Sequence, residues 1–188
     1  MGIEVNKDWT LFLDRDGVIN VENKGTYITD WSEFRFCDGA LEALGNVAQL
    51  FGTIIVVTNQ RGVGRGIMSI DDLKDINNKM VAAIANASGR IDKVYACTAL
   101  EDDNHNRKPN TGMGEQAKED FSNIDFSKSV MVGNNLSDME FGKRQSMHTV
   151  FLTTTNPPFE LPHDLIDEQY ASLLSWTEQF VSSHISEN

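Results

Sequence analysis

Cysteine and long apolar runs are both scarce in this sequence. Its two cysteines, Cys37 and Cys97, cannot build the disulfide framework typical of small secreted proteins. No apolar stretch approaches the ~20 residues that a membrane-spanning helix needs. The first ten residues also lack the apolar core of a secretion signal. These absences predict a cytoplasmic protein with no membrane segment.

Positive charge is in short supply as well. The 188 residues include 16 Lys and Arg against 28 Asp and Glu, a formal net charge of −12. Such a surface repels nucleic acids and anionic membranes unless a basic patch intervenes, so we expect neither as a partner. A small anionic metabolite is not excluded, because a metal ion and a few cations can reverse the field within one site. The length fits a single domain over residues 1–188, which we expect to be a monomer.

The apolar pattern alternates between strands and helices along the chain. Strands are predicted at residues 10–14, 52–60, 92–99, 129–135 and 148–154, and helices at residues 38–51, 68–87, 111–121, 137–147 and 166–183. Such alternation predicts a three-layer, Rossmann-like α/β fold, in which a parallel sheet has helices on both faces. Ligands bind at the carboxyl ends of the strands in sheets of this kind, and four polar clusters are expected there.

The first cluster, in "LFLDRDGVIN" (residues 11–20), holds two acids. Asp14 can act as a nucleophile toward phosphorus, and Asp16 as a general acid and base. Carboxylate and carbonyl oxygens of the pair also suit Mg²⁺. A surface turn that merely ends a strand would account for the same residues.

The second cluster, in "VVTNQRGVGRG" (residues 56–66), places small hydrogen-bond donors after a buried strand. The Thr58 hydroxyl and the Asn59 amide can hold phosphate oxygens, and the glycines let the loop approach a ligand. The segment is not a P-loop, because it lacks the Gly-Lys-Ser/Thr ending. An ordinary flexible turn is the alternative.

The third and fourth clusters follow later strands. Lys108, in "NRKPNTGM" (residues 106–113), can neutralise a phosphoryl group, and Arg107 can grip a second anionic part of a substrate. In "MVGNNLSDMEFG" (residues 131–142), Asn134 and Asp138 can serve a metal ion. A solvated basic pair and an ordinary helix cap, with Ser137 as the N-cap, are the alternatives.

Together, "FLDRDGVIN", "VVTNQ", "RKPNTGM" and "VGNNLSDME" resemble the four motifs of the haloacid dehalogenase superfamily of phosphohydrolases. The resemblance implies Asp14 as nucleophile, Asp16 as general acid and base, Thr58 and Lys108 as phosphoryl stabilisers, and Mg²⁺ as cofactor. Within the superfamily, "DRDGVINV", Tyr27, "FRFCDGA" and "TNQRGVGRG" resemble the family of heptose-bisphosphate and histidinol-phosphate phosphatases. The Arg65–Gly66 pair favours the sugar phosphate, and histidinol phosphate remains the alternative substrate.

The resemblance also sets the expected site. The metal ligands are Asp14, Asp16, Asn134 and Asp138, and the substrate-binding residues are Asn20, Asn59, Gln60, Arg61, Arg65, Arg107 and Asn135. No large cap domain is visible. The fourth motif usually has Asp where this chain has Asn134, which leaves open a weakly active sugar-phosphate-binding protein. The paired Cys and His residues of a zinc loop are missing, so no zinc is predicted, and Cys97 is interpreted as a core thiol.

Overall fold

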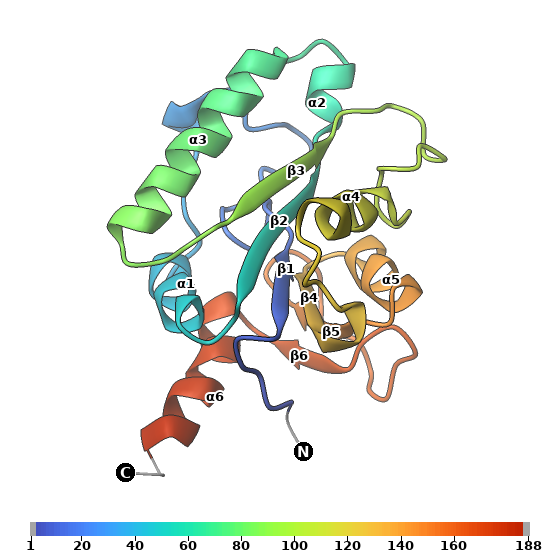
Figure 1. Ribbon diagram of the computed structural model, residues 1–188. Coiled ribbons are helices and arrows are strands. Elements are labelled where there is room, and N and C mark those ends of the chain that lie inside the picture. Colours follow the sequence, from blue (N-terminus) through green and yellow to red (C-terminus); the bar gives the residue numbers. More distant parts are fainter. Residues whose placement is uncertain (1–2, 186–188) are drawn as a thin grey trace.

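A single parallel β-sheet forms the centre of the protein. The structure, a computed structural model, describes residues 3–185. The sheet has six strands in the order β3-β2-β1-β4-β5-β6 (Figure 1). The strands are β1 (Thr10–Leu13), β2 (Thr53–Asn59), β3 (Lys93–Cys97), β4 (Ser129–Gly133), β5 (His148–Leu152) and β6 (Glu168–Tyr170). The helices are α1 (Ala40–Ala48), α2 (Arg61–Gly64), α3 (Ile70–Asn86), α4 (Gly112–Asp120), α5 (Leu136–Arg144) and α6 (Leu173–Ile185).

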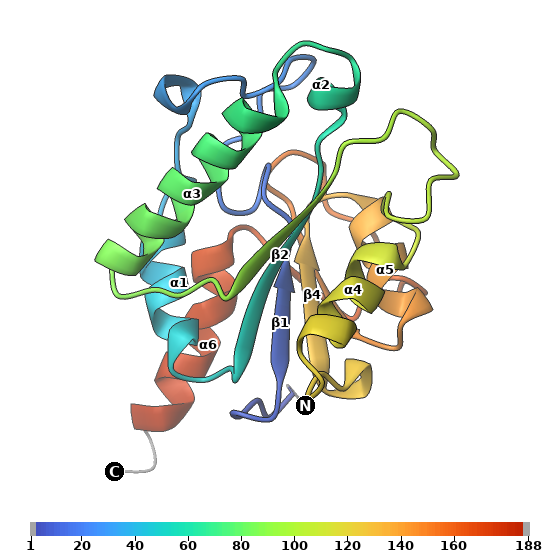
Figure 2. The ribbon, with the colours of Figure 1, turned by 45° about the horizontal axis from the view of Figure 1, so that its top comes forward.

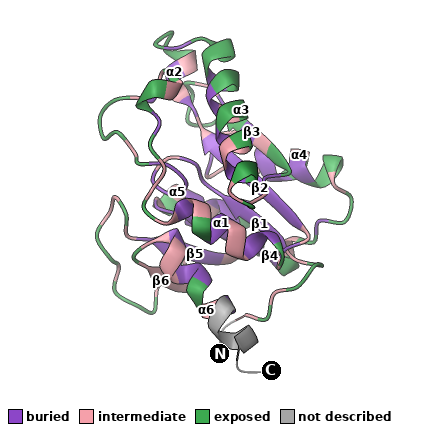
Figure 3. Cartoon of the chain, turned by 90° about the vertical axis from the view of Figure 1, so that its left-hand side faces the viewer, coloured by how far each residue is buried: buried purple, intermediate pink, exposed green. Residues whose placement is uncertain are grey.

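The central strands are apolar without alternation because helices cover both faces of the sheet. Leu11 and Leu13 point into the core under α1, α3 and α6, whereas Phe12 points into the core under α4 and α5. Figure 2 shows these two helical layers on opposite sides of the strands. Figure 3 shows that most of the strand residues are buried and that the outer face of α3 is exposed. The predicted three-layer α/β fold is thus confirmed.

All strand pairs are parallel, so the carboxyl ends of the strands meet at one edge of the sheet. The loop after β1, the short helix α2 and the loop after β3 lie at this edge (Figure 2). Within residues 3–185, the connection from β1 to α1 contains only a 3₁₀ turn (Trp31–Glu33), and the connection from β3 to α4 contains no helix or strand. No helix of this part of the chain is long and apolar enough to cross a bilayer.

Two details of the predicted elements were wrong. The predicted helix at residues 166–183 is divided: β6 pairs with β5, and α6 begins only at Leu173. The Asp167 carboxylate fixes this register by accepting a hydrogen bond from the Thr149 amide at 2.8 Å, so tertiary pairing overrides the local helical pattern. Helix α5 begins at Leu136 after Asn135, so Ser137 lies inside the helix and is not its N-cap.

Candidate active site

Most of the predicted site residues meet at the carboxyl edge of the sheet. A pocket of about 260 Å³ there is lined by Asp14, Asp16, Asn59, Gln60, Arg107, Lys108, Asn135 and Asp138, among others. Asp14 directly follows β1, Asn59 ends β2, and Asn135 and Asp138 follow β4. The parallel topology therefore brings residues that are far apart in the sequence to one site.

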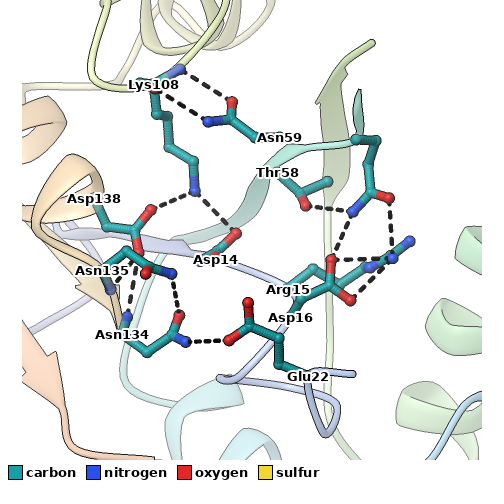
Figure 4. A network of polar contacts seen from close by, with 11 residues as sticks. Asp14, Arg15, Asp16, Glu22, Thr58, Asn59, Lys108, Asn134, Asn135 and Asp138 are labelled. Atoms are coloured by element: carbon teal, nitrogen blue, oxygen red, sulfur yellow. Dashed lines mark hydrogen bonds and ion pairs between the residues drawn. The ribbon is translucent and has the colours of Figure 1, made fainter. Parts of the chain in front are cut away.

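Lys108 lies at the centre of the site (Figure 4). Its Nζ atom donates hydrogen bonds to Asp14 Oδ1 at 2.9 Å and to Asp138 Oδ1 at 2.6 Å. The lysine side chain is only 1% exposed. Burial lowers the pKa of Lys108, but the carboxylates of Asp138 and Asp14 outweigh this effect and raise it above its ordinary value. The ammonium group therefore stays charged between the two acids.

Asp14 has an environment unlike that of an ordinary surface acid. Burial raises the pKa of Asp14 to about 7, and the nearby charge of Asp138 adds to this effect, while Lys108 opposes it. The carboxylate of Asp14 is thus poorly solvated and is compensated by one lysine shared with a second acid. A site of this kind attracts a further positive charge.

The side chain of Asn59 fixes the backbone of Lys108. The Lys108 amide donates to Asn59 Oδ1 at 3.0 Å, and Asn59 Nδ2 donates to the Lys108 carbonyl at 3.1 Å. This reciprocal pair links the end of β2 to the loop that carries the lysine. We predicted Asn59 as a substrate-binding residue through its backbone amide, and the structure adds a positioning role for its side chain.

Asp16 is surrounded by donors on several sides. Its carboxylate accepts from Gln60 Nε2 at 2.7 Å and from Asn20 Nδ2 at 2.9 Å, and it pairs with the guanidinium of Arg15 at 3.1 Å. Burial raises the pKa of Asp16, but Arg15 and the hydrogen bonds outweigh it and hold the pKa below its ordinary value. The two acids of "DRD" therefore differ strongly in their readiness to lose a proton.

Two residues predicted to contact substrate, Asn20 and Gln60, hydrogen-bond to other residues of the site. Asn20 is completely buried and donates to Asp16, so it orients that acid and does not face the pocket. Gln60 lines the pocket, but its Nε2 atom also donates to Thr58 Oγ1 at 2.8 Å. The hydroxyl predicted to hold phosphate thus accepts a hydrogen bond from the protein, and its own O–H group can still donate to a phosphate oxygen.

Asn134 is completely buried beside the loop that follows β1. Its Nδ2 atom donates to Thr155 Oγ1 at 2.6 Å and to Glu22 Oε2 at 3.1 Å. Gly17, with a φ of +84°, packs so closely that a Cβ atom there would lie 2.1 Å from Asn134 Nδ2. Glycine is therefore required at position 17 both by the backbone conformation and by this contact.

Asp138 holds the loop after β4 as well as Lys108. Its Oδ2 atom accepts from the backbone amides of Asn135 at 3.0 Å and Asn134 at 3.2 Å. Both of its oxygens thus have protein partners, and its role as a metal ligand stays a prediction.

The arginines predicted to bind substrate lie at the rim. Arg61 and Arg107 both contact the exposed carboxylate of Asp102, Arg107 through Nε at 3.2 Å. Of the two, only Arg107 lines the pocket. Arg65 lies outside the pocket lining, with its guanidinium 5.8 Å from the centre of the Tyr27 ring.

The donors near Asp14 suit a hard cation such as Mg²⁺. The predicted donors are the carboxylate of Asp14, the carbonyl of Asp16 and the amide oxygen of Asn134, although Asn134 lies outside the pocket lining and its Oδ1 accepts from Asn135 Nδ2 at 3.2 Å. Mg²⁺ usually takes only one or two carboxylates besides phosphate and water. Within residues 3–185, no three His, Cys, Asp or Glu side chains form a metal-binding group by themselves. The set therefore fits Mg²⁺ that is completed by substrate and water.

Cys97 is buried in the core, as interpreted from the sequence. Its thiol lies 3.7 Å from Asn104 Oδ1, whereas the ring of His105 contacts Glu115 at 2.8 Å. The two side chains have separate partners, and the expected absence of zinc stays a prediction.

Glu22, Asp102 and the side-chain role of Asn59 were not predicted from the sequence. Glu22 lies on the loop after β1, 112 residues from its partner Asn134. Its only sequence signal is an acid shortly after the "DRDG" turn. No local pattern reveals a contact over such a distance.

Comparison with known proteins identifies the relatives of this chain. The Polynucleotide kinase 3 phosphatase family matches residues 8–166. The D-glycero-alpha-D-manno-heptose-1,7-bisphosphate 7-phosphatase of Campylobacter jejuni is 37% identical over 146 residues, which cover 78% of this chain and 83% of that protein. The D-glycero-beta-D-manno-heptose-1,7-bisphosphate 7-phosphatase of Pasteurella multocida is 33% identical over 155 residues, which cover 79% and 83% of the two chains.

A solved structure agrees with the fold. D,D-heptose 1,7-bisphosphate phosphatase from B. bronchiseptica, complexed with magnesium and phosphate, superposes with a TM-score of 0.81. The match covers 93% of this chain and 99% of the other at 24% identity, so it supports the fold alone.

The raised pKa of Asp14 predicts a pH-dependent effect of Asp14→Asn on stability. The folded protein retains the Asp14 proton up to about pH 7, whereas the unfolded chain loses it near 3.8. The wild type therefore loses stability relative to the variant as pH rises from about 4 to 7, by at most about 1.4 kcal/mol per pH unit. Urea denaturation of both proteins in a chelator measures this difference. An equal difference at pH 5 and pH 8 would contradict the assigned environment.

Proposed function

This chain belongs to the phosphatases of the haloacid dehalogenase superfamily and is related to the D-glycero-D-manno-heptose-1,7-bisphosphate 7-phosphatases, and we propose that it hydrolyses D-glycero-D-manno-heptose 1,7-bisphosphate. The observation that supports this function best is the buried ammonium of Lys108 between Asp14 and Asp138, at the edge where the loops after β1 and β2 converge. A nucleophile, a cation and hydrogen-bond donors for a phosphoryl group are all present there.

Asp14 is the nucleophile in this proposal. One of its carboxylate oxygens attacks phosphorus in line with the departing sugar oxygen, and the P–O bond to the sugar breaks as the aspartyl-phosphate forms. Lys108 reduces the repulsion between the carboxylate and the incoming phosphate. Thr58 and the backbone amide of Asn59 bind the remaining phosphoryl oxygens. Mg²⁺, when bound by the oxygens near Asp14, would neutralise further charge on the phosphoryl group.

Asp16 exchanges the proton in both halves of the reaction. Its low pKa favours the carboxylate, the form that takes a proton from the water that hydrolyses the aspartyl-phosphate. The first half requires a protonated Asp16, which gives its proton to the sugar oxygen. A phosphate dianion beside Asp16 raises its pKa, because like charges disfavour the ionised form, and this promotes the uptake of that proton.

The rim of the pocket supports a substrate with two phosphates. Arg107 lines the pocket and contacts Asp102, while its Nη1 atom is buried without a hydrogen-bond partner among the described residues. A guanidinium with an unused donor suits the second phosphate of a bisphosphate. Relatives that act on the alpha and on the beta anomer have similar identity to this chain, so the proposal covers both.

Phosphate release from a panel of substrates tests the proposed reaction. We expect Mg²⁺-dependent release from heptose 1,7-bisphosphate at a kcat/KM at least tenfold above that for histidinol phosphate and for a 3′-phosphorylated oligonucleotide. Asp14→Asn should abolish release, because it removes the nucleophile.

Three results would contradict this assignment. Preference for histidinol phosphate would replace the proposed substrate, and full activity of Asp14→Asn would reject the mechanism. Negligible turnover in the wild type that rises strongly in Asn134→Asp would favour a sugar-phosphate-binding protein.

Arg107→Met should weaken recognition of the second phosphate. Loss of a charge-assisted hydrogen bond costs about 1.5–3 kcal/mol, which corresponds to a rise in KM for the bisphosphate of about tenfold to a hundredfold. KM for the heptose 7-monophosphate should change less than about twofold. Arg35→Met, at an exposed residue outside the pocket lining, is the matched control. Equal losses on both substrates would show that Arg107 does not recognise the second phosphate.

A further inference from the structure

Glu22 is an acid of the active-site pocket that the mechanism above does not use. It lines the same pocket as Asp14 and Lys108. Its Oε2 atom accepts a hydrogen bond from Asn134 Nδ2 at 3.1 Å. In Figure 4 one oxygen of its carboxylate faces the amide of Asn134, and the other points away from that amide.

Glu22 has no ion pair among residues 3–185, and Lys24, which lines a neighbouring pocket with it, donates to the Thr155 carbonyl instead. Lys108 pairs with Asp14 and Asp138, and Arg15 pairs with Asp16. In the part of the chain that the structure describes, no lysine, arginine or histidine forms an ion pair with Glu22. A half-buried carboxylate without an ion pair, which lines the same pocket as an acid whose single cation is shared, marks a place where a positive charge is favoured.

Asn134 cannot provide that negative charge, because its side chain is a neutral amide. The amide is also fixed in orientation: Nδ2 donates to Thr155 and Glu22, and Oδ1 accepts from Asn135 Nδ2 at 3.2 Å. Gly17 packs closely against the same amide, with no room for a Cβ atom. The N–H group of Asn134 thus holds one oxygen of Glu22, and the other oxygen remains available to the pocket.

We propose that Glu22 supplies the negative charge for the divalent cation of this site that the neutral Asn134 does not supply, and that Asn134 holds Glu22 in position. In the usual fourth motif the acid would stand at position 134. Here Asn134 is the neutral partner and Glu22 is the acid, so the hydrogen-bonded pair carries a single negative charge. This inference rests on the metal dependence of the proposed function.

Exchange of the two side chains tests the proposal. The electron paramagnetic resonance signal of free Mn²⁺ measures how tightly the substrate-free protein binds this ion. The proteins compared are the wild type, Glu22→Gln, Asn134→Asp and the double variant Glu22→Gln/Asn134→Asp. Glu22→Gln should weaken Mn²⁺ binding by about tenfold to a hundredfold. The double variant should recover most of the loss, because it restores one acid and one amide.

The matched control is Glu119→Gln, which makes the same change of charge at an exposed position on α4 and should bind Mn²⁺ like the wild type. Glu22→Ala serves as a second variant, and thermal melts in a chelator confirm that the variants are folded. Wild-type affinity in Glu22→Gln or Glu22→Ala would overturn the proposal, as would a loss in Glu22→Gln that the double variant does not recover.

The outcome is separable from that of the proposed function. A wild type with Mg²⁺-dependent phosphatase activity, together with Glu22→Gln that binds Mn²⁺ normally, would remove the role of Glu22 and leave the reaction intact. A wild type that binds Mn²⁺ through Glu22 but releases no phosphate would support the role of Glu22 and reject the proposed reaction.

Discussion

The buried ion pairs of Lys108 with Asp14 and Asp138 are the interaction on which the site depends. Three ionisable groups are removed from water here, and such burial is tolerable only because the lysine lies within hydrogen-bond distance of both acids. The two acids follow neighbouring strands, β1 and β4, and the lysine comes from the loop after β3. The parallel sheet and the clamp of Asn59 on the Lys108 backbone hold all three in place. An arrangement with one cation for two acids leaves the site ready for a phosphoryl group and a metal ion.

Asp14 and Asp16 are separated by one residue, yet their surroundings shift their pKa values in opposite directions. Burial and the charge of Asp138 raise the pKa of Asp14, whereas Arg15 and two amide side chains hold the pKa of Asp16 down despite burial. The difference arises because Asp14 is buried beside Asp138 and shares its one cation with that acid, whereas Asp16 faces Arg15 (Figure 4) and also accepts hydrogen bonds from Gln60 and Asn20. The same short segment thus supplies groups suited to different tasks, a pattern expected where an acid–base pair does chemistry.

The fold and the centre of the site could be predicted from the sequence, because apolar strands and their polar ends are local signals. Asp14, Asp16 and Lys108 followed from such signals and from the resemblance. The helix expected at residues 166–183 failed because the pairing of β6 with β5 is not encoded locally. Glu22 was missed for the same reason, since its partner Asn134 is distant in the sequence. The substrate contact expected of Asn20 became a contact with Asp16, which only packing decides.

Location of the phosphoryl group after an acid quench tests the central claim most directly. The wild type is mixed with heptose 1,7-bisphosphate and Mg²⁺, quenched within milliseconds, and digested for mass spectrometry. The account predicts a phosphoryl group on the peptide that contains Asp14, attached to that side chain, and its absence from Asp14→Asn. A phosphoryl group on another residue, or hydrolysis in the wild type with no phosphorylated peptide at any quench time, would contradict the account.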